Sequence, residues 1–179
     1  GATWTSRTLP TTETYYSVCW SPQLGRFCTV AYNATNTYSN AAISSDGVNW
    51  TKTTILPGVT AVWRSVCWSP QLGLFCTVGE NYVAATSPDG TNWTQRSLTG
   101  LNYSYFNVCW APTIGFCTVS SSPGSNVITS PDGITWTQRA FSAFNDAQKY
   151  ALCYAPELGV LCTIGYGSSN VAISSPATP

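Results

Sequence analysis

The apolar residues of this chain fall in short runs that end at turn-forming residues, and the same arrangement returns four times. Blocks such as SVCWSPQLGRFCTV begin at residues 17, 65, 107 and 151, and each carries two cysteines on either side of a turn that contains Pro and Gly. A second short segment of small and β-branched residues follows each block after a variable polar stretch. Runs of this length between Pro and Gly are typical of β-strands joined by tight turns.

A further turn closes each of the first three repeats and has the sequence Ser-x-Asp-Gly-x-x-Trp. It occurs as SSDGVNW at 44–50, SPDGTNW at 87–93 and SPDGITW at 130–136. The aspartate offers an acceptor for nearby backbone N–H groups, and the glycine can take a positive φ. The motif therefore predicts a repeated corner, after which the tryptophan begins an outer strand and packs over the turn.

The fourth repeat has no such corner after VAISS at 171–175, and a matching outer-strand sequence stands at the other end of the chain. Trp4-Thr5-Ser6-Arg7 matches the Trp-Thr-Gln-Arg sequences that begin at Trp93 and Trp136. This split predicts a closed ring, in which the first strand of the chain completes the last repeat and leaves no open sheet edge. Closure within one chain is the simpler arrangement, and an exchange of terminal strands between two chains is the alternative.

Repeats of about 45 residues have room for four strands each, which matches the blade of a β-propeller. The predicted fold class is all-β: a four-bladed β-propeller in a single domain, residues 1–179. Its blades are expected at approximately 11–56, 57–100, 101–144, and 145–179 together with 1–10. In the second repeat we expect strands near 64–68, 74–79, 82–87 and 92–97.

The spacing of the corner resembles the Asp-box of sialidase-like propellers, Ser-x-Asp-x-Gly-x-x-Trp, with one residue fewer between Asp and Gly. The whole repeat, from CWSPQLGLF to TSPDGTNWTQR, looks like the blades of tail-fibre and other surface proteins of bacteriophages and large viruses. The resemblance implies a propeller on a virion or another extracellular surface. It implies no single activity, because Asp-boxes are mostly turns that stabilise the fold and occur in enzymes and binding proteins alike.

Charged residues are few, which narrows the expected partners and reactions. Seven acidic and seven basic residues give zero net charge, and the scattered Lys and Arg lack the basic patch of a nucleic-acid-binding protein. No apolar run reaches the ~20 residues of a membrane helix, so neither nucleic acid nor membrane insertion is expected. The chain has no histidine, which excludes Ser-His and Cys-His nucleophiles and histidine metal sites. We expect no cofactor and no metal.

A glycoside hydrolase is the enzyme that the Asp-box likeness would suggest, and the carboxylates argue against it. Outside the corner turns the chain has four: Glu13, Glu80, Asp146 and Glu157. They fall in different expected blades without a shared motif, whereas a glycosidase needs two facing carboxylates about 5–10 Å apart. A sialidase also needs clustered arginines, but Arg7, Arg96 and Arg139 recur on the expected outer strands. We assign no catalytic residue.

The cysteines form pairs, each on the two sides of one hairpin. The pairs are Cys19/Cys28, Cys67/Cys76, Cys109/Cys117 and Cys153/Cys162. Cysteines opposite each other on adjacent strands are close enough for a disulfide where the local geometry allows. Cysteine is also a common buried apolar residue, which a repeat copies with the rest of its core. We favour reduced core thiols, with disulfides as the alternative, and the spacing is unlike the Cys-x-x-Cys zinc signature.

Aromatic residues at irregular positions are the best sign of a binding function. They lie in or near the variable loops: Tyr32, Tyr38, Trp63, Tyr82, Tyr103, Tyr105 and Tyr166. Tyr and Trp on the loops of a rigid frame supply flat apolar area with a polar edge, which suits carbohydrate and protein recognition. The candidate ligand-binding residues follow the second strand of a repeat, with two polar neighbours: Tyr32, Asn33, Asn81, Tyr82 and Tyr166.

These observations favour a non-catalytic recognition module that binds a glycan or a cell-surface receptor, on a viral tail fibre or a similar surface appendage with other fibre subunits as further partners. A structural or protein-docking propeller is the alternative, and a sialidase-like glycoside hydrolase is a further one. A glycan-binding propeller would carry equivalent exposed aromatic clefts in several blades. A docking module would instead carry one contiguous apolar patch.

Overall fold

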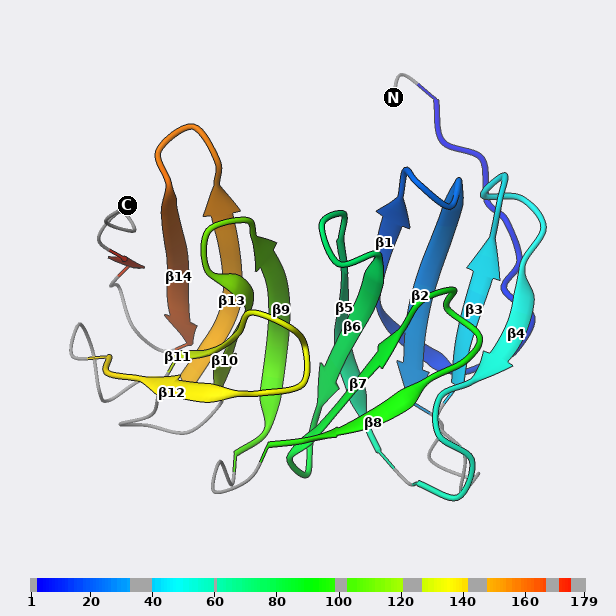
Figure 1. The fold of residues 1–179 in the computed structure, drawn as a ribbon. Helices are drawn as coiled ribbons and strands as arrows, with labels where there is room; N and C mark the ends of the chain where they lie inside the picture. Colours follow the sequence, from blue (N-terminus) through cyan, green and yellow to red (C-terminus); the bar gives the residue numbers. More distant parts are fainter. Residues whose placement is uncertain are drawn as a thin grey trace.

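The computed structural model describes residues 3–32, 40–59, 61–98, 103–120, 127–141, 148–166 and 171–174, and the regular structure within them is all β (Figure 1). The first sheet consists of β1 (Thr14–Ser21), β2 (Arg26–Tyr32), β3 (Asn40–Ser44) and β4 (Thr51–Thr54). The second consists of β5 (Trp63–Ser69), β6 (Leu74–Gly79), β7 (Val83–Ser87) and β8 (Thr94–Ser97). The third consists of β9 (Tyr105–Ala111), β10 (Gly115–Ser120), β11 (Val127–Ser130) and β12 (Thr137–Arg139). The fourth consists of β13 (Gln148–Ala155), β14 (Val160–Tyr166) and β15 (Val171–Ile173).

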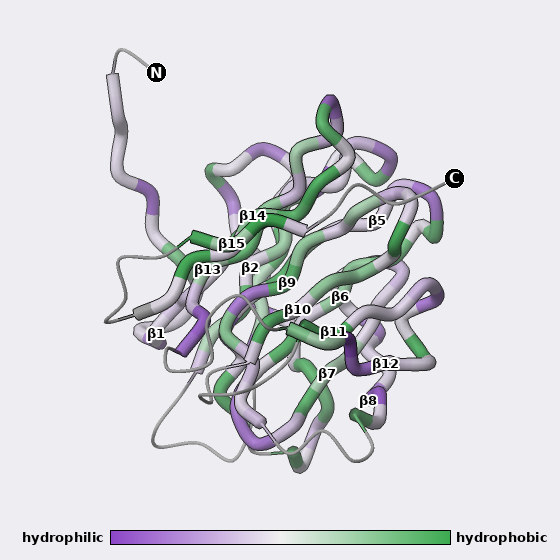
Figure 2. The backbone as a smooth tube through the Cα atoms, turned by 90° about the vertical axis from the view of Figure 1, so that its left-hand side faces the viewer, coloured by the Kyte–Doolittle hydropathy of each residue, from purple (hydrophilic) through white to green (hydrophobic). Residues whose placement is uncertain are grey.

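The sheets stand side by side in chain order, each an antiparallel meander (Figure 1). Their first strands are neighbours, with β1 in contact with β5, β5 with β9, and β9 with β13. Hydrophobic residues concentrate along the strands, and the more hydrophilic positions lie mainly at the turns and outer strands (Figure 2). The expected strands of the second repeat are confirmed to within one or two residues, because Pro and Gly mark its turns so clearly.

Closure of the ring within one chain is not seen. Residues 3–9 have no strand structure, and among the described residues β15 pairs only with β14. The N-terminal segment lies beside the first sheet, at the opposite end of the array from β15 (Figure 1). An outer strand can form only where it reaches a free sheet edge, and the edge of β15 is out of reach of residues 3–9 in this open array. The fourth sheet therefore has three strands within the described chain.

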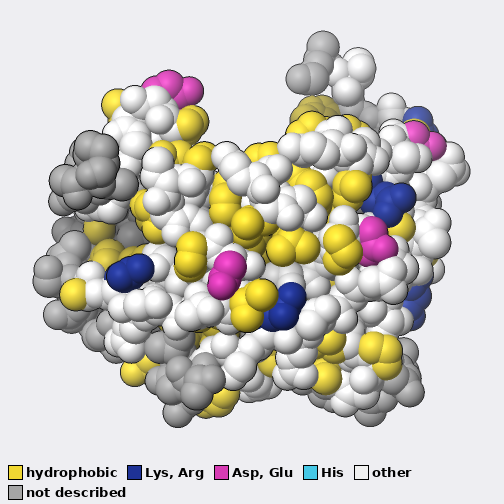
Figure 3. All heavy atoms as spheres, in the orientation of Figure 1, with side chains coloured by type: hydrophobic (Ala, Val, Ile, Leu, Met, Phe, Trp, Pro, Cys, Tyr) yellow, Lys and Arg dark blue, Asp and Glu magenta, His cyan; other side chains and the backbone are white. Residues whose placement is uncertain are grey.

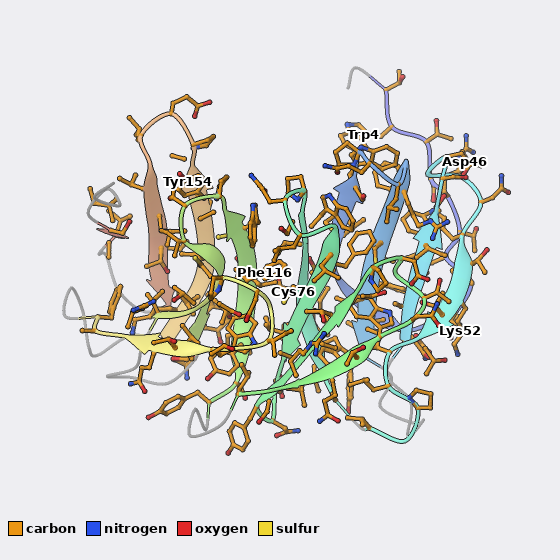
Figure 4. The ribbon with its side chains drawn as sticks, in the orientation of Figure 1. Trp4, Asp46, Lys52, Cys76, Phe116 and Tyr154 are labelled. Carbon is orange, nitrogen blue, oxygen red and sulfur yellow. The ribbon has the colours of Figure 1, made fainter. Side chains whose placement is uncertain are left out.

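The cores lie between successive sheets and repeat the same residue types. Figure 4 shows Cys76 and Phe116 in the interior between the second and third sheets, where they pack in one apolar cluster. The paired cysteines are direct register partners, such as Cys19 with Cys28, yet all are free thiols. Burial raises the pKa of Cys19 to about 12 and raises that of Cys28 well above its usual value. Cys28, Cys76 and Cys117 on the second strands are buried, whereas Cys153 in the fourth sheet is exposed.

The Ser-x-Asp-Gly corners form the predicted hydrogen-bonded turns. In the second repeat, Asp89 Oδ1 accepts the N–H groups of Thr91 (2.8 Å) and Asn92 (2.7 Å), and Ser87 Oγ accepts that of Gly90 (2.8 Å). The indole N–H of Trp93 donates to the Gly90 carbonyl oxygen at 3.1 Å. Gly90 has a φ of +77°, which favours glycine at this position. The first repeat makes the same set of contacts around its own aspartate.

These corners predict a loss of stability in acid. Partial burial opposes the ionisation of Asp89, but hydrogen bonds from the backbone of Asn92 and Thr91 outweigh it and lower the pKa to about 2. A carboxyl whose pKa is lower in the folded state stabilises the fold above its unfolded pKa of ~3.9 and loses that effect as pH falls through the folded value. The thermal midpoint should therefore fall between about pH 4 and pH 2.

Unfolding scans across this range test the expectation, with Asp89→Asn as the comparison. The asparagine variant retains an acceptor but has no carboxyl to titrate, so its midpoint should start lower at neutral pH and fall less in acid. Equal acid sensitivity in the two proteins would show that the corner is not responsible.

Candidate functional site

One residue in the innermost strand of every repeat is skipped in the strand register. The register shifts between Tyr15 and Ser17, between Trp63 and Ser65, and between Lys149 and Ala151, with a corresponding shift in β9. The skipped residues, here called the bulge residues, are Tyr16, Arg64, Phe106 and Tyr150. A β-bulge re-aims its extra side chain out of the regular alternation. These side chains are therefore free of the cores between sheets.

The bulge residues meet around one hollow of about 380 Å³ that runs across the four innermost strands. Its lining is Tyr16, Ser17, Arg64, Ser65, Phe106, Asn107 and Tyr150. Every sheet thus contributes to it from the same repeat position. The described part of the chain brings these residues together although they are up to 134 positions apart in sequence (Tyr16 to Tyr150).

Arg64 lies in an aromatic frame within this hollow. Its guanidinium carbon is 4.3 Å from the ring centroid of Tyr16 and 5.2 Å from that of Phe106. The Phe106 and Tyr150 rings follow, with centroids 4.6 Å apart and planes at 39°. Stacking between a guanidinium and aromatic rings is favourable and holds the charge in place.

Glu80 fixes the other side of the same guanidinium. Arg64 donates from Nε to Glu80 Oε1 at 2.9 Å and also from Nη2 to the same oxygen. Both side chains are partly exposed. In the part of the chain that the structure describes, no acceptor lies against Nη1, so that edge of the fork can meet a carboxylate or carbonyl oxygen of a ligand.

Serine side chains fix the spacing of the frame. Ser17 Oγ on β1 accepts the N–H of Val66 on β5 at 3.2 Å, and Ser65 Oγ on β5 accepts the N–H of Val108 on β9 at 3.1 Å. Each bond joins neighbouring sheets one residue away from a bulge. The distances between Tyr16, Arg64 and Phe106 are therefore set by the scaffold rather than by loops.

Three of the residues expected to bind ligand, Tyr32, Asn81 and Tyr82, are described, and they do not line this hollow. Tyr32 ends β2 and pairs with Thr14, whereas Tyr82 follows β6 and is exposed, with φ near +64°. In the second repeat, the position that matches Tyr32 is Glu80, and Tyr82 lies two residues beyond it. Asn81 is exposed beside it, and Asn33 lies outside the described residues. Tyr166 ends β14 opposite Gln148, and its side chain is outside the described part of the molecule.

Two of the irregular aromatic residues prove to be core residues. Trp63 and Tyr105 are fully buried, in the clusters between the first and second and between the second and third sheets. They begin β5 and β9, just before the bulges, so their side chains enter the alternation that faces the core. Exposure on loops was the wrong interpretation for both.

Two of the carboxylates outside the corner turns contact polar or basic side chains. Glu80 is paired with Arg64, and Glu13 contacts Asn40 and lies 3.8 Å from Lys52. Asp146 is outside the described residues.

No group of three or more Cys, Asp or Glu side chains that could hold a metal ion occurs within the described ranges. Those ranges also contain no helix of the length and apolarity needed to cross a membrane. Charged side chains are few and lie scattered on the face seen in Figure 3.

Comparison with known proteins identifies the architecture. No family model matches the chain, and no curated protein sequence does. Among solved structures, YCF48 from Cyanidioschyzon merolae is similar with a TM-score of 0.69 and 16% identity, covering 96% of this chain and 56% of that one. YCF48 bound to D1 peptide has a TM-score of 0.68 and 17% identity, with 95% and 54% covered. A GH74 enzyme of Niastella koreensis has a TM-score of 0.66 and 18% identity, with 83% and 25% covered.

These structures are β-propeller-like and all-β, and the chain spans about half the length of the two YCF48 structures. The likeness to Asp-box repeats and to viral tail-fibre blades rests on the sequence motif alone. At identities of 16–18% the similarity concerns the fold and assigns no activity. The chain has an all-β, β-propeller-like fold built from four antiparallel sheets.

Proposed function

We propose that this chain is a non-catalytic protein-docking module that binds an extended peptide across the hollow formed by the bulge residues. The observation that carries the proposal is the placement of Tyr16, Arg64, Phe106 and Tyr150 at one repeat position around one hollow. The residue at this position changes between repeats, whereas the Val-Cys-Trp run that follows it recurs in three of the four repeats, as expected where a rigid frame presents its binding groups.

The chemistry of the hollow suits a peptide with an acidic group. The Nη1 edge of Arg64 can receive a carboxylate, while the partly exposed rings of Tyr16 and Tyr150 offer flat surfaces to apolar side chains. Aromatic residues and arginine supply most of the energy in many protein interfaces. A structure similar in fold, YCF48, is described as bound to D1 peptide, which supports a peptide partner for this architecture.

Replacing Arg64 should distinguish specific peptide binding in the hollow from nonspecific peptide binding elsewhere on the protein. We expect an array of synthetic peptides that differ in net charge to yield acidic binders, and Arg64→Ala to weaken them by about 30-fold, because a buried interface arginine contributes about 2 kcal/mol. The measurement is fluorescence polarisation with the best labelled peptide. Arg96→Ala is the matched control, because Arg96 lies on outer strand β8 and donates to Thr86 Oγ1 at 2.8 Å away from the hollow.

A glycan array with the same protein tests the competing hypothesis. Binding of a defined sugar that depends on Tyr82, together with no peptide binding, would refute peptide docking and favour glycan recognition. Peptide binding that Arg64→Ala leaves unchanged would place the binding site away from the hollow.

A further inference from the structure

The two end sheets leave uncovered the faces that every other sheet buries. The leading face of a sheet is the one turned toward the preceding repeat; in the first sheet it carries Val18, Trp20 and Phe27. The trailing face is turned toward the following repeat; in the fourth sheet it carries Ile164, Val171 and Ile173. Both are exposed or half-buried at the two ends of the array (Figure 1).

The leading face of the first sheet carries apolar residues at the same positions as the leading faces of the other three sheets, which are covered. Val18 is 58% exposed, whereas Val66 and Val108 at the same repeat position are 4% exposed. Trp20 is likewise half-exposed, whereas Trp68 is buried against the first sheet. A hollow of about 510 Å³ remains on this face between the sheet and the N-terminal segment, lined by residues that include Leu9, Val18 and Thr29.

The trailing face of the fourth sheet repeats the other half of the same interface. Ile164 is 50% exposed, whereas Val78 and Val119 at its repeat position are fully buried. Val171 and Ile173 on β15 extend this apolar surface to the edge of the sheet. Within the chain such a trailing face is covered three times, each time by the leading face of the next sheet. The leading face of a sheet is therefore the surface that fits the exposed trailing face of the fourth sheet.

Two of the three internal interfaces contain a Trp–Gln hydrogen bond, and the matching positions also occur on the two end sheets. The indole N–H of Trp68 donates to Gln23 Oε1 of the preceding repeat at 2.7 Å, and that of Trp110 donates to Gln71 Oε1 at 2.6 Å. The fourth repeat has Glu157 at the glutamine position, on an exposed hairpin. Trp20 is the matching donor on the first sheet.

The fourth sheet lacks an outer strand, and the segment with the matching sequence lies beside the leading face of the first sheet. Residues 3–9 carry the outer-strand sequence from Trp4 onward but lie beside the first sheet, and Trp4 is 92% exposed and projects outward near the N-terminus (Figure 4). In the described chain the outer edge of β15 has no strand beside it. Any fourth sheet that packs on the first sheet brings these two halves of a blade together.

We propose that two copies of this chain associate head to tail, with the trailing face of each covering the leading face of the other, to form one closed ring. The N-terminal segment of each copy then supplies the outer strand of the partner's fourth sheet. A ring of two is favoured over a longer assembly because the chain covers 56% of a larger propeller-like chain, so each copy forms roughly half of a ring of similar size. Both joints are the interface already formed three times within each copy.

The mass of the chain in solution, measured by native mass spectrometry and light scattering over a wide concentration range, tests the proposal. We expect a particle of twice the 19.2 kDa chain mass. Val18→Asp and Ile164→Asp should each raise the dimer dissociation constant by about 100-fold, because each places a charge in both joints. An equimolar mixture of the two variants should recover a dimer, since one wild-type leading face and one wild-type trailing face remain to pair.

Two further variants keep the test independent of folding. Glu157→Lys, on the exposed hairpin, should weaken the dimer by about 10-fold through the lost contact with Trp20. Ile134→Asp, an equally exposed apolar residue at the tip of a corner, should leave it unchanged. A monomer at every concentration, an open-ended polymer, or variants that fail to complement each other would overturn the proposal. Peptide binding through Arg64 is measured separately, so failure of one proposal does not imply failure of the other.

Discussion

Replacing Gly115 with alanine is expected to lower the free energy of unfolding by about 4 kcal/mol or more, which would leave little of the fold's stability. Gly115 has a φ of +108°, and a Cβ atom on it would lie 2.1 Å from the carbonyl oxygen of Ser130. Both groups belong to the backbones of paired strands, so neither can rotate away. The alanine variant must therefore separate β10 from β11, and urea unfolding followed by circular dichroism measures the loss.

The second repeat supplies the control for this substitution. Gly73 lies in the corresponding hairpin with a φ of +63°, but a Cβ atom there would have open space around it. Gly73→Ala should lose only the ~1–2 kcal/mol of a left-handed alanine. The difference arises because the third hairpin is one residue shorter, which moves its glycine to the strand position that Leu74 holds in β6. Equal losses in the two variants would rule out the clash with Ser130 as the cause.

Replacing Phe75 with alanine is expected to cost about 3–5 kcal/mol, the usual range for a large aromatic residue removed from a packed core. Phe75 is fully buried between the first and second sheets, and its ring centroid is 4.6 Å from that of Trp68. The same ring lies against Gly90 of the Asp-Gly corner. Its loss therefore loosens both an interface between sheets and a turn. Thermal and chemical unfolding at neutral pH measure the effect.

Phe27 provides the matched comparison in the first repeat. Its ring packs against Trp20 with centroids 4.5 Å apart, much as Phe75 packs against Trp68, but it is only partly buried because no sheet precedes its own. In dilute solution Phe27→Ala should therefore cost clearly less than Phe75→Ala. A loss as large as that of Phe75→Ala would show that the leading face of the first sheet is covered in solution.

Much of the fold can be predicted from the sequence because the turns contain proline and glycine, whose backbone preferences mark where strands end. Pro70, Gly73 and Gly90 mark the hairpins and the corner of the second repeat, and the strands between them fall where expected. The ring was harder to predict. The sequence at Trp4 indicates an outer strand, but no local pattern specifies how far each sheet rotates against the next, and that rotation decides whether four sheets close.

The hollow lined by the bulge residues could not be predicted from the sequence, for a different reason. Strict alternation of side chains assigns Tyr16 and Arg64 to ordinary strand positions, and a β-bulge has no residue signature of its own here. One signal was present: the position before each SVCW-type block changes between tyrosine, arginine and phenylalanine, whereas the cysteine three residues later recurs in all four repeats. The sequence instead favours loop aromatic residues such as Tyr82, because a variable polar loop can be recognised in a sequence and a β-bulge cannot.

A frame of four similar sheets would by itself accept a ligand in several equivalent orientations. The bulge positions prevent this, since Arg64 is the one cation among three aromatic residues and Glu80 holds it from its own sheet. In the proposed complex, a peptide with its acidic group at Arg64 would lie over one ring, that of Tyr16, on one side and over the rings of Phe106 and Tyr150 on the other. The broken symmetry at a single position gives the hollow a polarity, and with it a means to distinguish a sequence from its reverse.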